Sequence, residues 1–260
     1  MNDAQHEADA LKEGTVMLNL LIKNVMNYSN QLKTFLRATA VCSFLGALTT
    51  TLLIFLPNPE AADFEARTLL YSNSLYLSKL WILFIHPQVN VLAIIGVAFI
   101  LFKKYPLNVV FGTLFLFVWA YTEMSQQALL IDALNQIWRP GYLNADNEIT
   151  KNMFTTLIHS ASGISDSKYF LVIYGFGIGT FFYGLAFIRK NGLSKWIGIS
   201  LLFIGILSFS SFLRYYLGID SLNGIVNWSY KWIYPYLQPL VRIAIGIWIL
   251  LEIKKEHNTV

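Results

Sequence analysis

Six long apolar stretches constrain the fold of this chain more than any other feature. Each approaches or exceeds the roughly 20 residues that an α-helix needs to cross the hydrocarbon core of a membrane. They lie at 36–56, 80–102, 107–134, 169–188, 196–213 and 237–253. Charged residues make up only 13% of the 260 residues, against about 25% in an average soluble domain. The sequence therefore predicts an all-α, polytopic integral membrane protein whose six-helix transmembrane domain covers residues 36–254, and it excludes an ordinary soluble enzyme.

Basic residues lie in alternate connections between these stretches. They precede the first stretch, follow the second, follow the fourth and follow the sixth, as Lys23, Lys33, Arg37, Lys103, Lys104, Arg189, Lys190, Lys195, Lys254 and Lys255. Cytoplasmic loops of membrane proteins carry an excess of lysine and arginine. With six spans all these residues fall on one side, so we expect cytoplasmic N- and C-termini. The layout resembles that of small bacterial integral membrane proteins. We expect the protein to lie in the bacterial cytoplasmic membrane.

Residues 1–35 form a separate, N-terminal segment with a different pattern. Between Leu11 and Leu32, apolar residues recur at helical spacing among lysine, asparagine and glutamine. This pattern predicts an amphipathic helix on the cytoplasmic side. Two positions for it remain open, one on the membrane surface and one packed on protein.

The outer connections also carry patterns. Residues 148–160 place apolar side chains on one face, which predicts a short interfacial helix. Residues 215–236 are crowded with tyrosine and tryptophan, which concentrate at the headgroup level of membranes. We expect this aromatic belt to anchor the protein, with a lid or lipid-contacting platform as the alternative.

Two glycines in the fourth stretch predict close helix packing. Gly175 and Gly179 are four residues apart and share one helix face. Small residues at this spacing allow two helix backbones to approach closely within a membrane. Packing inside one chain is the preferred interpretation, and dimerisation is the alternative.

Several polar residues fall at membrane depth, where ionisable groups are expensive and usually face the bundle interior. Counting from the ends of the stretches places them in the outer half of the bilayer. The resulting candidate pocket consists of Glu123, Arg242, His86, Asn90, Gln126, Gln127 and Arg214. Glu123 is the deepest acid and Arg242 the deepest base, so they are the groups that most need partners.

This cluster supports three hypotheses. In the first, a water-reached pocket binds or moves a small polar or anionic molecule, or a lipid headgroup, with Glu123 as acid or proton carrier and Arg242 as anion binder. In the second, the protein is an enzyme acting on a lipid-borne substrate, with Glu123 as general acid–base. In the third, Glu123 and Arg242 form a closed ion pair that only fixes helix packing. Water around Glu123 would favour the first two.

The sequence predicts no cofactor and no metal. Motifs of metallohydrolases, serine hydrolases, nucleotide-binding loops and dithiol redox sites are absent. The basic residues flank apolar stretches, so they indicate a membrane surface as the partner and not a nucleic acid. The expected partners are the lipid bilayer and, under the first two hypotheses, a small-molecule or lipid ligand. An oligomer is compatible with the sequence.

Overall fold

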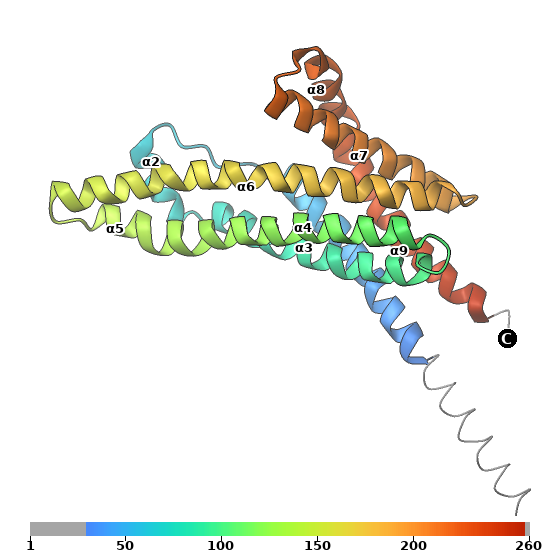
Figure 1. Ribbon diagram of the computed structural model, residues 1–260. Helices are drawn as coiled ribbons and strands as arrows, with labels where there is room; N and C mark the ends of the chain where they lie inside the picture. Colours follow the sequence, from blue (N-terminus) through green and yellow to red (C-terminus); the bar gives the residue numbers. More distant parts are fainter. Residues whose placement is uncertain (1–29, 258–260) are drawn as a thin grey trace, which may run out of the picture.

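The computed structural model describes residues 30–257, with side chains described as far as Lys255. Within this range every regular element is a helix (Figure 1). Six helical segments are long and apolar enough to cross a membrane. They are the first helix (Asn30–Phe55), α3 (Ser74–Leu101), the segment Pro106–Leu143 containing α4, η2 and α5, then α6 (Glu148–Ile188), α7 (Leu193–Leu217) and α9 (Tyr234–His257). The expected all-α six-helix architecture is therefore confirmed, and the amphipathic helix predicted at 11–32 lies almost entirely outside the described residues.

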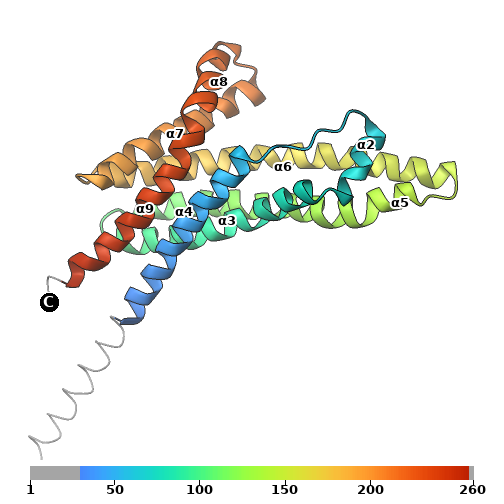
Figure 2. The ribbon, with the colours of Figure 1, turned by 180° about the vertical axis from the view of Figure 1, so that it is seen from behind.

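The start of the first helix and the end of α9 lie at the same end of the bundle, together with the α3–α4 and α6–α7 turns (Figures 1 and 2). Two cation–π contacts connect these segments. The Arg189 guanidinium lies 5.8 Å from the centre of the Tyr105 ring, and the Lys190 ammonium lies 4.9 Å from the centre of the Trp248 ring. The basic connections are thus gathered at one end of the molecule. The opposite end is called the outer end below.

Helix boundaries follow local capping signals. The Asn73 side chain accepts a hydrogen bond from the Tyr76 amide at 2.9 Å and begins α3. Pro106 occupies the first turn of α4, where its missing N–H is no loss. Gly218 ends α7 with a φ of 67°, a left-handed conformation that glycine adopts without steric penalty.

Residues 148–160 are part of α6, so the prediction of a separate interfacial helix was wrong. Asn147 caps the helix by accepting from the Thr150 amide at 2.9 Å, and α6 then runs for 41 residues. At about 1.5 Å per residue this is roughly 60 Å, twice the hydrocarbon thickness of a bilayer. About half of α6 therefore extends beyond the length that a membrane crossing requires.

The preceding segment is equally long and pairs with α6 as a helical hairpin (Figure 1). Here α4 (Pro106–Ala128) continues through the π-helical η2 (Leu129–Trp138) into α5 (Arg139–Leu143). Leu134, Tyr142, Ile158 and Ala161 form a small apolar core between the two arms. Phe64 of α2 (Phe64–Thr68) covers it, with its ring centre 5.2 Å from that of Tyr142. The outer half of the hairpin therefore has an apolar core of its own, separate from that of the bundle.

Glycines on two faces of α6 hold the centre of the bundle together. A β-carbon on Gly175 would lie 2.8 Å from the Phe115 carbonyl oxygen of α4. One on Gly177 would lie 3.3 Å from Ser208 Cβ of α7. The Gly175–Gly179 face thus packs inside the chain, as preferred from the sequence, and a second glycine face packs on α7.

The first helix lies between α3 and α9. Thr39 of the first helix packs against Gly96 of α3 so closely that a β-carbon on Gly96 would overlap the Thr39 side chain. The Ser43 hydroxyl donates to the Arg242 carbonyl of α9 at 2.6 Å. At the outer end, α7 and the short helix α8 (Asn223–Trp232) diverge from α6 (Figure 1). This divergence positions the larger cavity described next.

Candidate functional site

The larger cavity has a volume of about 280 Å³ and lies towards the outer end of the bundle. We call it the outer cavity. Side chains from seven helices line it: Thr50, Leu53, Ile54, His86, Trp119, Glu123, Tyr169, Val172, Ile173, Phe176, Ser208, Tyr230, Tyr234 and Gln238. A cavity needs only about 10–15 Å³ to accept one water, so this one has room for many waters or a small organic ligand.

Glu123 and His86 both line the outer cavity, as the sequence predicted for the candidate pocket. Glu123 is 9% exposed, and its carboxylate interacts with the indole N–H of Trp119, one turn earlier on α4. The His86 Nδ1 lies 2.8 Å from the Thr49 hydroxyl. Thr49 of the first helix thus fixes the position of the imidazole ring. The Glu123 side chain faces the outer cavity.

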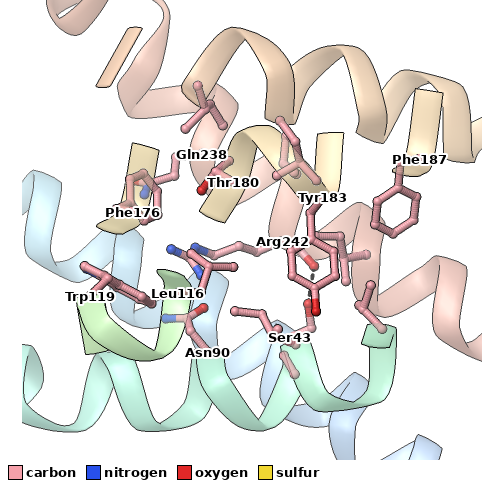
Figure 3. A pocket seen from close by; sticks show the side chains of 17 residues that line it. Ser43, Asn90, Leu116, Trp119, Phe176, Thr180, Tyr183, Phe187, Gln238 and Arg242 are labelled. Carbon is pink, nitrogen blue, oxygen red and sulfur yellow. Dashed lines mark hydrogen bonds between the residues drawn. The ribbon is translucent and has the colours of Figure 1, made fainter. Parts of the chain in front are cut away.

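A second, smaller cavity lies deeper in the bundle. We call it the inner cavity; its volume is about 70 Å³. Polar lining groups come from Ser43, Asn90, Thr180, Tyr183, Gln238 and Arg242, and the remaining walls are apolar. Figure 3 shows the Arg242 side chain crossing this cavity, with its guanidinium directed towards Trp119 and Asn90.

Trp119, Phe176 and Gln238 line both cavities and form the partition between them. The Trp119 and Phe176 ring centres are 5.3 Å apart, and the His86 ring lies edge-on to Trp119 at 6.1 Å. Asn90, which lines the inner cavity, donates a hydrogen bond at 2.6 Å to the backbone carbonyl of His86, which lines the outer cavity. The side chains of Trp119, Phe176 and Gln238 therefore lie where the two cavities adjoin.

Glu123 and Arg242 do not form the direct ion pair considered in the structural hypothesis. No nitrogen of Arg242 lies within 4.0 Å of a Glu123 carboxylate oxygen. The two groups still attract each other through space. Arg242 Nε is buried and has no hydrogen-bond partner among the described residues. Each charge therefore faces its own cavity.

Three residues of the candidate pocket lie outside both cavities. Gln126 donates to the Ser165 carbonyl of α6 at 2.9 Å. Gln127 is 4% exposed, and its Oε1 has no hydrogen-bond partner among the described residues. Arg214 donates to Asn227 at the exposed outer surface. His86 and Glu123 thus share the outer cavity, and Asn90 and Arg242 share the inner cavity. The three remaining residues of the candidate pocket lie elsewhere.

The sequence analysis left several polar lining residues out of the pocket, among them Tyr169, Tyr230, Tyr234 and Gln238. A usable signal existed for Gln238, because it precedes Arg242 by four residues and so shares its helix face. Tyr230 and Tyr234 were assigned only to the aromatic belt, and Tyr169 only to the start of the fourth apolar stretch. Burial raises the pKa of the Tyr230 hydroxyl, which therefore stays protonated as a hydrogen-bond donor near the cavity mouth.

Histidine, cysteine and acidic side chains do not gather into a metal site in the part of the chain that the structure describes. His159, for example, stacks on Phe64 with ring centres 5.0 Å apart. Comparisons with known proteins assign no relatives. No protein family matches the chain, and neither a curated protein nor a solved structure is similar to it.

Proposed function

We propose that this membrane protein binds a small polar molecule, or the polar headgroup of a lipid, in the outer cavity. The observation that carries the proposal is the Glu123 carboxylate. It is buried at membrane depth, faces a cavity of about 280 Å³, and has no cationic partner within 4.0 Å among the described residues. Ionisable groups inside a membrane are expensive and usually serve a ligand, an ion or a proton. A purely structural role would favour a closed pair with Arg242.

The lining supports a ligand that forms a few directed hydrogen bonds. His86, Ser208 and the tyrosines from α6, α8 and α9 provide polar groups, while Leu53, Ile54 and Val172 provide apolar walls. Ligand sites combine apolar walls with a few placed polar groups in this way. The basic connections at the opposite end support a cytoplasmic position for both termini, so the ligand enters from the non-cytoplasmic side.

Cysteine labelling tests this proposal. In a Cys42→Ser background, Leu53→Cys introduces a thiol that lines the outer cavity. Leu48→Cys is the matched control, because Leu48 lies on the same helix, is 54% exposed and lines neither cavity. A membrane-impermeant cationic methanethiosulfonate applied from the outer side should label Leu53→Cys but leave Leu48→Cys in lipid unlabelled.

The charge of Glu123 gives a second readout. An ionised carboxylate attracts a cationic reagent and repels an anionic one. The ratio of the cationic to the anionic labelling rate at Leu53→Cys should therefore fall when Glu123→Gln is added. If Leu53→Cys is as unreactive as Leu48→Cys, the outer cavity is closed to polar solutes and the proposal is wrong.

A further inference from the structure

The inner cavity contains an arginine, Arg242, whose guanidinium has no direct partner among the described residues. The Arg242 guanidinium forms no hydrogen bond or ion pair with any other described residue. The backbone carbonyl of Arg242 accepts a hydrogen bond from the Ser43 hydroxyl. A guanidinium carries five donors and remains charged under all ordinary conditions. Its position at membrane depth therefore calls for an anion from outside the protein.

Three other polar residues of the inner cavity, Ser43, Asn90 and Tyr183, form hydrogen bonds within the protein. The Asn90 amide donates to the His86 carbonyl at 2.6 Å, and the Tyr183 hydroxyl lies 2.7 Å from the Thr113 hydroxyl. Gln238 and Thr180 have no such partner among the described residues and lie on the same side of the cavity as each other (Figure 3). The donor set open to a ligand is therefore one guanidinium, one amide and one hydroxyl.

This donor set fits a singly charged anion with two coplanar oxygens. A guanidinium binds a carboxylate through two parallel N–H···O bonds. A phosphate dianion would bring a second charge that these groups do not neutralise, and burying an unmatched charge is strongly unfavourable. The remaining walls, which include Ile94, Val97 and Ile245, are apolar and suit a hydrocarbon substituent.

The size of the cavity limits this substituent. A volume of about 70 Å³ is roughly half that of an engineered 150 Å³ cavity that binds benzene. A carboxylate with one or two further carbons fills such a space. The inner cavity adjoins the outer cavity at Trp119, Phe176 and Gln238, which line both, so the outer cavity is the route by which a ligand would reach it.

We propose that the inner cavity is a binding site for a short-chain monocarboxylate, held by Arg242 with Gln238 and Thr180. This inference rests on the proposed function, because the ligand reaches Arg242 through the outer cavity. An ionised Glu123 would repel the entering anion, so neutralising it should not weaken binding at Arg242.

The test measures binding of propionate to the purified protein by titration calorimetry, with chloride and inorganic phosphate at equal ionic strength as comparison anions. Wild-type protein should bind propionate saturably and at least tenfold more tightly than phosphate. Arg242→Lys, which keeps the charge but loses the planar fork, should weaken binding at least tenfold. Arg242→Gln should abolish it, and Glu123→Gln should bind at least as tightly as wild type.

Two variants control for location. Arg214→Gln removes an arginine that lines neither cavity and should leave propionate affinity unchanged. Ala93→Leu fills the inner cavity and should abolish propionate binding while leaving the labelling of Leu53→Cys intact. That labelling reports the outer cavity alone, so it separates failure of this inference from failure of the proposed function. Absence of propionate binding in the wild type, equal affinity for chloride, or unchanged binding in Arg242→Gln would overturn the proposal.

Discussion

Substitution of Gly175 by alanine tests the closest approach between α4 and α6. The new β-carbon would lie 2.8 Å from the Phe115 carbonyl oxygen and 2.9 Å from the Trp119 amide nitrogen. Both are backbone atoms, so side-chain rotation cannot relieve the contact. Ordinary van der Waals contact begins near 3.4 Å, and the two helices must therefore separate by about half an ångström. A gap of this size already loses about a quarter of the dispersion energy of the affected contacts.

Gly163→Ala is the matched control on the same helix. A β-carbon at Gly163 meets no atom within 4 Å. Both substitutions gain about 1 kcal/mol of helix propensity, so their difference isolates the steric term. Overpacking in a close-packed interior typically costs about 1–3 kcal/mol. At about 2–4 °C per kcal/mol, Gly175→Ala should unfold roughly 2–12 °C below Gly163→Ala.

The assay is thermal unfolding of both purified variants in one detergent at one scan rate, because the apparent Tm of a membrane protein depends on both conditions. Gly163→Ala should equal or exceed the wild type. Equal melting temperatures for the two variants would show that α4 and α6 are not in backbone contact at Gly175. In that case the position of Trp119, and with it the partition between the cavities, would also be wrong.

Three further predictions concern the site and the topology. Glu123→Gln should raise the apparent Tm by a few degrees, because it removes a buried charge without breaking a direct pair; a clear loss of stability would show that Glu123 has a structural partner. Reporter fusions at Lys104 and Lys190 should be cytoplasmic, and either one found outside would contradict the proposed orientation. A spin label at Leu18 should be shielded from aqueous quenchers while one at Asn24 is reachable, and equal accessibility would exclude an amphipathic helix there.

The six crossings were predictable because one physical rule governs them: backbone polar groups in lipid must be satisfied within the helix, over a fixed apolar length. The ends were not predictable from the same rule. Beyond the bilayer a helix needs no apolar surface all round, so α6 continues outwards through Lys168 and Gly163 to Asn147. The capping signal of Asn147, with its acceptor side chain, marked the true start. Gly163, next to serine residues, gave a misleading loop pattern.

The sequence predicted the membrane depth of the candidate site residues, but only partly the direction in which their side chains point. Counting residues from the ends of the spans placed His86 and Glu123 in the outer half of the bilayer, and both line the outer cavity. Counting does not give the rotation or crossing of a helix. Gln126 lies three residues after Glu123, but it turns towards Ser165 on α6. Gln238 had not been considered, although it lies between the levels of Glu123 and Arg242 and lines both cavities.

The separation of Glu123 from Arg242 is the feature that a rule of charge pairing could not predict. Two opposite charges 4 Å apart attract by roughly 4 kcal/mol at an effective dielectric constant of 20, so a bundle stabilised only by internal contacts would favour their approach. Instead, the Trp119 ring lies between His86 and Phe176 and forms part of the wall between the cavities. Each charge remains exposed to an internal space large enough for water. Keeping two opposite charges apart at membrane depth costs a protein stability. A ligand that pairs with one of these charges can restore that stability.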